Sequence, residues 1–142
     1  MMKTFNFKRG ITAILVVTLA YFLMDMVVHH LILGKMYQET MSLWRPLPEI
    51  MAKRWVAFLG YPFFGILFVA FFWVGFDAEK YPLGQGVRYG CLMGVFYWGS
   101  HLLINYPFDP VPDKLYLAWF SFGVIEFVLL GFLAGLLVRS KK

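Results

Sequence analysis

Four long apolar stretches, separated by charged or proline-containing segments, dominate the sequence. They cover Ile11–Leu33, Val56–Phe76, Gln85–Asn105 and Leu115–Val138. Each holds roughly 20 residues or slightly more, enough for a helix to cross a hydrocarbon core of about 30 Å. We therefore predict an all-α integral membrane protein in which residues 1–142 form a single transmembrane domain, a four-helix bundle.

The segments between these stretches are polar connections of unequal length. The predicted outer loop, residues 34–55, is too long for a tight turn. We expect it to lie along the membrane interface, with a short amphipathic helix around Lys35–Ser42. The other two connections are shorter and cover Asp77–Leu83 and Tyr106–Lys114.

The first apolar stretch follows basic residues, as the apolar region of a secretory signal peptide does. Its apolar run is longer than a signal peptide requires, however, and no A-x-A-like cleavage site ends it. We therefore expect it to remain in the mature protein as a membrane span.

Composition supports lipid as the solvent for much of the chain. Hydrophobic residues make up 61% of the sequence and charged residues 15%, against about 45–50% and 25% in soluble domains. The net charge of +5 is better explained by anionic lipid headgroups than by nucleic acid, which we do not expect as a partner. The single cysteine, Cys91, lies in an apolar run and forms no C-x-x-C motif.

The distribution of basic residues predicts the orientation. Eight of the 13 Lys and Arg residues fall at the N-terminus, in the second connection or just after it at Arg88, and at the C-terminus, and five fall in the other two connections. Since cytoplasmic segments carry the excess of positive charge, both termini are expected in the cytoplasm.

Glycine spacing indicates where helices pack. Gly90 and Gly94 form one G-x-x-x-G pattern, and Gly131 and Gly135 form another. Small residues at this spacing let helix backbones approach closely in a membrane. We expect these four glycines to mediate helix packing.

Five ionisable residues lie within the predicted spans, where charge is costly and usually functional. They are Asp25, His29, His30, His101 and Glu126. Steps of three and four residues place Asp25 and His29 on one stripe of the first helix, and Tyr97 and His101 on one stripe of the third. With Tyr61 of the second helix at a similar depth, we expect an outward-facing polar pocket. Its predicted members are Asp25, His29, Tyr61, Tyr97, His101 and Glu126.

Three kinds of chemistry could use this pocket. Imidazoles and carboxylates suit a metal ion, with Asp25, His29, His101 and Glu126 as its ligands or their supports. The same groups in series could pass protons. A b-type haem held between His29 and His101 is a third alternative. Phosphate loops, G-x-S-x-G elbows and H-E-x-x-H motifs are absent, so we expect a non-enzymatic protein, with a small membrane enzyme as an alternative.

The polar residues could instead serve only to order the bundle. Asp25 could pair with His29 or Tyr61 and fix the packing of two helices. The chain would then be an accessory subunit of a larger membrane complex, or a homo-oligomer, with one aromatic face buried against its partner.

A resemblance supports the architecture. Asp25 and His29 form an Asp-x-x-x-His at the end of the first span, and Leu43-Trp44-Arg45-Pro46 follows in the loop. In these features the chain resembles a group of small, uncharacterised bacterial four-span membrane proteins. The resemblance implies location in the bacterial inner (cytoplasmic) membrane, and it singles out Trp44, Arg45 and Glu126 in addition. His101 is not part of the shared pattern, which counts against the haem alternative.

Overall fold

The computed structural model describes residues 7–138, and every regular element among them is helical. Three helices are long and apolar enough to cross a membrane. The first, Phe7–Ile32, consists of α1 (Phe7–Met26) and the π-helical segment η1 (Val27–Ile32), and the other two are α3 (Leu47–Gly75) and α6 (Asp113–Val138). The prediction of an all-helical chain suited to a membrane is confirmed.

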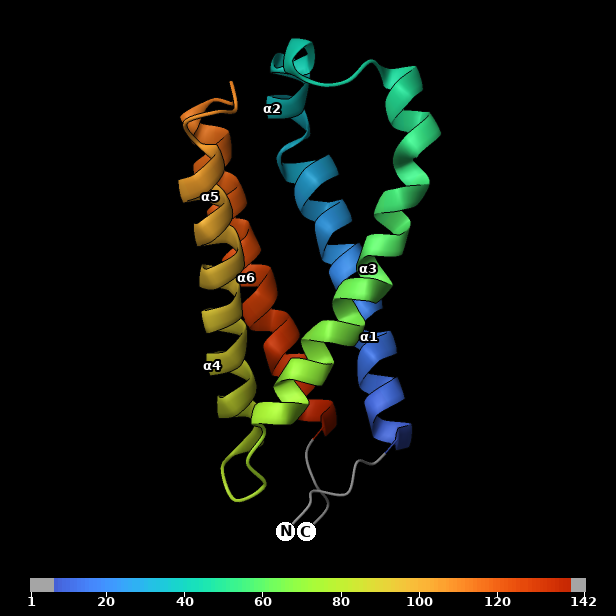
Figure 1. The fold of residues 1–142 in the computed structure, drawn as a ribbon, viewed down its shortest axis with the longest axis vertical. Coiled ribbons are helices and arrows are strands. Elements are labelled where there is room, and N and C mark those ends of the chain that lie inside the picture. Colours follow the sequence, from blue (N-terminus) through green and yellow to red (C-terminus); the bar gives the residue numbers. More distant parts are fainter. Residues whose placement is uncertain (1–6, 139–142) are drawn as a thin grey trace.

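The predicted third span has a different internal structure. It falls within α4 (Pro82–Gly94), a π-helical segment η3 (Val95–Gly99) and the short helix α5 (Ser100–Asn105). Figure 1 shows this run lying alongside α6. Because the α-helix is interrupted at η3, no single helix here matches the three long ones in length.

The second helix begins well before the predicted boundary at Val56. Helix α3 starts at Leu47, so part of the predicted outer loop is helical. Pro48 lies in its first turn, where a missing amide hydrogen costs nothing. Glu49, also in that turn, forms ion pairs with Arg45 and Lys53, which favours the helix start further. The remaining loop holds α2 (Gly34–Glu39) and a 3₁₀ turn η2 (Met41–Leu43), close to the predicted short helix.

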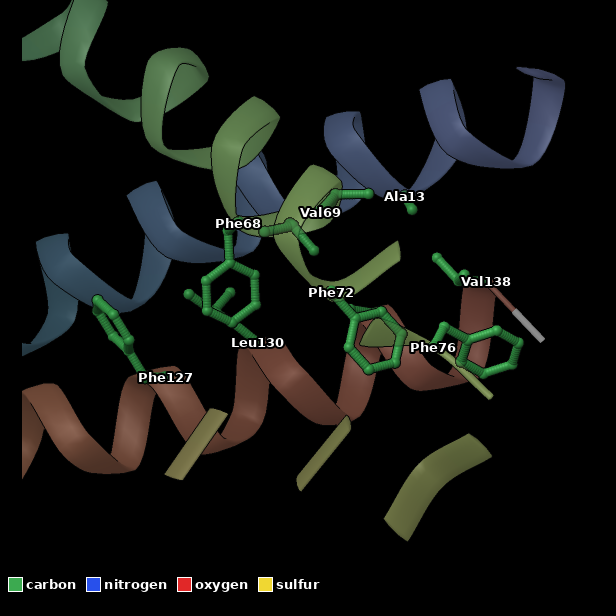
Figure 2. Close-up of a cluster of buried hydrophobic side chains, with 10 residues drawn as sticks. Ala13, Phe68, Val69, Phe72, Phe76, Phe127, Leu130 and Val138 are labelled. Carbon is green, nitrogen blue, oxygen red and sulfur yellow. The ribbon is translucent and has the colours of Figure 1, made fainter. Parts of the chain in front are cut away.

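The molecule has two ends, which we call basal and apical. Helix α1 begins and α6 ends at the basal end, whereas α2 and the α5–α6 connection lie at the apical end (Figure 1). The main core is nearer the basal end and is built from α1, α3 and α6 (Figure 2). A smaller cluster of Val28, Leu33 and Leu115 joins α1, α2 and α6 at the apical end.

Helices α4 and α6 make the closest backbone approach in the described part of the chain. A Cβ atom at Gly86 would overlap the carbonyl of Gly131, and one at Gly90 would overlap the carbonyl of Phe127. Gly94 faces Val124 and Phe127, and Gly135 faces the carbonyl of Pro82. Glycine is therefore required at this interface because any larger side chain would separate the two backbones.

Helix α3 contacts α1 through Phe58 and Tyr61, but its buried residues all lie in its basal half. There the hydroxyl of Tyr89 on α4 donates to the carbonyl of Phe68 at 2.7 Å. Residues 51–60 in the apical half are exposed without exception, and Figure 1 shows this half diverging from α5 and α6. Pro62 lies at the junction of the two halves, where it removes a backbone donor from the helix.

Candidate functional site

A continuous run of polar contacts joins α3, α1, α2 and α6. The hydroxyl of Tyr61 donates to Oδ2 of Asp25 at 2.5 Å. Oδ1 of Asp25 lies 3.3 Å from Nε2 of His29, and Nδ1 of His29 lies 2.5 Å from the hydroxyl of Tyr37. Nε1 of Trp119 donates to that hydroxyl at 2.6 Å. We call these five residues the polar chain.

The donors and acceptors of the polar chain have a fixed direction. The indole of Trp119 can only donate, so the Tyr37 oxygen is the acceptor of that bond. Among the described residues, Nδ1 of His29 is the one acceptor placed to receive the Tyr37 proton. His29 therefore carries its own proton on Nε2, which faces Asp25. The carboxylate of Asp25 thus faces two hydrogen-bond donors, the hydroxyl of Tyr61 and Nε2–H of His29.

Local structure positions each member of this chain. Asp25 lies in the last turn of α1, and His29 lies in η1, directly after it. Leu33, only 2% exposed, anchors the start of α2 in the apical cluster. This anchoring brings Tyr37 back over His29, and the two rings stack with centroids 5.6 Å apart. The side chains of Asp25 and His29 are 18% and 26% exposed, so the chain is largely shielded.

The loop residues Trp44 and Arg45 have separate roles. Trp44 donates to Oγ1 of Thr40 at 3.1 Å, and its ring packs against Tyr37 and Trp119. It therefore covers the apical end of the polar chain. Arg45 does not join that chain, because it forms an ion pair with Glu49.

Burial raises the pKa of Tyr37 to about 12, and the negative charge of Asp25 adds to this effect, while the hydrogen bond from Trp119 opposes it. Tyr37 is therefore a neutral hydroxyl at any physiological pH. In that form it can donate and accept a proton at the same time.

Glu126 lies deeper in the molecule than the polar chain. It is only 3% exposed, and its Oε1 has no hydrogen-bond partner within the described residues. Tyr21 lies among Asp25, Glu126, Tyr61 and Tyr97, within electrostatic reach of all four. The structure thus gathers five of the six predicted pocket residues in one region, and Tyr21 stands at its centre.

A groove of about 530 Å³ opens beside Asp25. Its walls come from α1, α3, α4, η3 and α6, and they are mainly aromatic. Asp25 and Tyr61 form a polar patch within it, and Tyr97 and Tyr21 also line it. A second, smaller cavity of about 260 Å³ lies between α1 and α6, and Glu126 is its one ionisable lining residue among those described.

His101, the sixth predicted residue, does not join this group. Its Nδ1 lies 3.0 Å from the side-chain nitrogen of Asn105, and its ring faces Trp98, Tyr116 and Trp119. The ring of Trp119 contacts both His101 and Tyr37, so aromatic side chains fill the space toward His29.

This arrangement bears on the metal and haem alternatives. Among residues 7–138, no three His, Cys, Asp or Glu side chains come together as a metal-ion site, so the set Asp25, His29, His101 and Glu126 is not assembled. Both nitrogens of His29 already face partners, which leaves neither directed at a haem iron shared with His101.

Sequence reasoning did not select Tyr37, Trp119 or Tyr21 as site residues. Tyr21 shares the helical stripe of Asp25, and that spacing was a usable signal. Tyr37 and Trp119 are 82 residues apart, and no spacing rule connects them.

Comparison with known proteins adds no further assignment. No protein family, curated protein or solved structure matches this chain.

Proposed function

We propose that this protein binds protons and passes them between the apical surface and Asp25 inside a four-span membrane bundle. The observation that carries the proposal is the directed polar chain from Trp119 and Tyr37 through His29 to Asp25. Chains of His and carboxylate groups within membranes are typical of proton relays.

The fourth crossing in this proposal is the helical run 82–105. At about 1.5 Å per residue it exceeds a hydrocarbon core of about 30 Å. It packs along α6 through the glycine interface, which favours two neighbouring crossings. The excess of basic residues in the sequence at the two termini and around the second connection favours cytoplasmic termini and an outward-facing apical end. Lys3, Arg139, Lys141 and Lys142 contribute to that excess but lie outside the described residues.

Proton transfer would proceed in concert along the polar chain. The Tyr37 proton moves to Nδ1 of His29, and the proton on Nε2 of His29 moves to Oδ1 of Asp25. The Tyr37 oxygen takes a replacement proton from water at the apical end. The chain returns to its starting state when Asp25 releases its proton and when His29, by exchange with water, loses the proton on Nδ1 and gains one on Nε2. Each step exchanges one O–H or N–H bond for another.

The experiment is a proton-flux measurement on the purified full chain in vesicles that contain a pH-sensitive dye. We expect an imposed potential to drive more proton flux than in protein-free vesicles. Asp25→Asn and His29→Gln should reduce that flux to the protein-free level, because each removes one exchangeable site of the chain.

His30→Gln is the matched control. His30 neighbours His29 in η1 but is exposed and lies outside the polar chain, so the flux should be unchanged. Flux equal to that of protein-free vesicles in the wild type, or equal sensitivity to loss of His29 and His30, would refute the proposal.

A second candidate function is that of an accessory or oligomeric subunit. One observation favours it: residues 51–60 of α3 are exposed on every side, and Trp55, Phe58 and Leu59 are among them. A partner helix could cover this half-helix. Native mass spectrometry of the protein extracted in mild detergent tests this candidate, which requires a complex heavier than 16.5 kDa.

A further inference from the structure

The groove beside Asp25 combines features that rarely occur together inside a membrane protein. Its volume of about 530 Å³ falls in the range of about 300–1,000 Å³ typical of small-molecule sites. Its lining includes the rings of Phe64, Phe96, Tyr97 and Phe127. Phe96 is 68% exposed, so the groove is open along the side of the bundle.

The charge in this groove is negative. Asp25 is the one ionisable acid that lines it, and Lys, Arg and His are absent from its described lining. Glu126 lies within electrostatic reach of the same region. A carboxylate in an apolar surrounding attracts a cation strongly because little water screens it.

The aromatic walls determine which cation fits. Ring faces attract organic cations through their quadrupoles, and this attraction strengthens when water is excluded. A metal ion requires several oxygen or nitrogen ligands, and no such set is assembled among the described residues. We infer that this groove is a binding site for lipophilic organic cations, with Asp25 as the counter-ion and the aromatic rings as the walls.

This inference rests on the proposed function in one respect, because Asp25 serves both. A proton delivered to Asp25 neutralises the carboxylate and removes the counter-ion, so a proton and a cation exclude each other. The groups facing Asp25 come from every neighbouring element. They are Tyr21 on α1, His29 on η1, Tyr37 on α2, Tyr61 on α3 and Glu126 on α6.

The test uses tetraphenylphosphonium as the probe, with the full chain in lipid nanodiscs and equilibrium dialysis as the readout. Asp25→Asn should weaken binding by about 10-fold or more, the effect of losing one strong ion pair. Gly60→Leu should also weaken binding, because Gly60 lines the groove and a Cβ atom added there meets no other atom within 4 Å. The variant should therefore fold and fill the groove.

Controls separate this site from general hydrophobic attraction. Gly75→Leu adds the same side chain to open space on the same helix, outside the groove lining, and should bind the probe normally. Tetraphenylborate has the same shape as the probe but the opposite charge, and its uptake should equal that of nanodiscs without protein, which serve as the baseline for both ions. Equal binding of both ions, or binding unaffected by Asp25→Asn and Gly60→Leu, would overturn the inference.

A second readout distinguishes this inference from the proposed function. Tyr37→Phe removes a member of the polar chain but changes no residue of the groove lining, so it should lower the proton flux and leave probe binding unchanged. Probe binding by a wild-type protein that gives no proton flux would leave the cation site in place and contradict the proton function. Proton flux without probe binding would contradict the cation site alone.

Discussion

Tyr37 connects the indole of Trp119 to the imidazole of His29 through two hydrogen bonds. The Trp119 indole only donates, and His29 needs a proton donor at Nδ1. A phenol hydroxyl satisfies both because it accepts one hydrogen bond and donates another. Phenylalanine would preserve the ring stacking on His29 and Trp119 but would remove the hydroxyl.

The hydrogen-bond direction predicts the tautomer of His29. Nitrogen-15 NMR of histidine-labelled protein should show His29 protonated on Nε2 and unprotonated on Nδ1. In Tyr37→Phe the preference should weaken, because Nδ1 loses its donor. His30, which is exposed, should be the same in both proteins. A wild-type His29 protonated on Nδ1 would reverse the direction proposed for the chain.

The raised pKa of Tyr37 predicts an alkaline transition. Its pKa in the fold is about 12, against about 10 when unfolded. The neutral hydroxyl thus adds stability that is complete below pH 10 and is lost as the pH rises to about 12. The wild-type absorbance titration near 295 nm, minus that of Tyr37→Phe, should show one phenol ionising near pH 12. A difference transition near pH 10 would show that Tyr37 is not shielded.

At the scale of elements, two π-helical segments coincide with the site. Segment η1 carries His29, and η3 carries Tyr97. Such segments are frequent at functional sites, since they change the direction of side chains within a helix. Both segments also interrupt regular α-helical geometry within a longer helix. Residue spacing therefore predicts less reliably which side chains share a face beyond them.

This explains which parts of the site sequence spacing could predict. Asp25 and His29 are four residues apart, and both the α-helical stripe and the structure bring them together. His101 follows η3, and its predicted convergence with His29 depended on an uninterrupted α-helix. The start of α3 was missed because Arg45 precedes it and its first two turns carry Glu49 and Lys53. A cluster of charged residues is typical of a loop in a hydropathy pattern, although here the charges form ion pairs with one another.

The glycine interface between α4 and α6 gives a prediction about stability. Gly131→Leu should destabilise the bundle by about 1–3 kcal/mol or more, because the side chain would overlap the backbone of Gly86 and Gly90. Unfolding in mixed detergent, followed by circular dichroism, measures this change. Gly99→Ala is the control, since its new methyl group would make only ordinary contact, 3.7 Å from Phe120. Equal stability of Gly131→Leu and wild type would exclude the close α4–α6 approach.

At the scale of the whole molecule, the two ends have different chemistry. The basal end is closed by an apolar core, and the apical end holds the polar chain beneath Trp44. Figure 1 shows α3 diverging from α5 and α6 toward the apical end, where residues 51–60 are exposed. Protons can therefore enter the proposed path from the apical side, and we expect their passage from Asp25 across the basal core to limit the rate of transmembrane flux.

The proposed orientation can be measured by cysteine labelling of intact cells. Cys91 is replaced by alanine, because it is the one cysteine of the chain. Ser42→Cys at the apical end should then react with a membrane-impermeant maleimide from outside. Glu79→Cys, in the basal α3–α4 connection, should react only after the cells are broken. The reverse pattern would place both termini outside and turn the polar chain toward the cytoplasm.

The close α4–α6 contact also has a consequence for how the protein is made. The ribosome makes α6 after α4, so Gly86 and Gly90 emerge before the backbone that they contact exists. Until then α4 has no glycine-lined partner, and Asp25 stands in the nascent chain without Trp119 to complete its polar chain. Helix α6 therefore completes this helix packing and the proposed proton path in the same step of synthesis. A chain truncated before α6 would contain the acidic Asp25 without its complete polar chain and the glycines of α4 without their packing partner. Membrane quality control can detect such features.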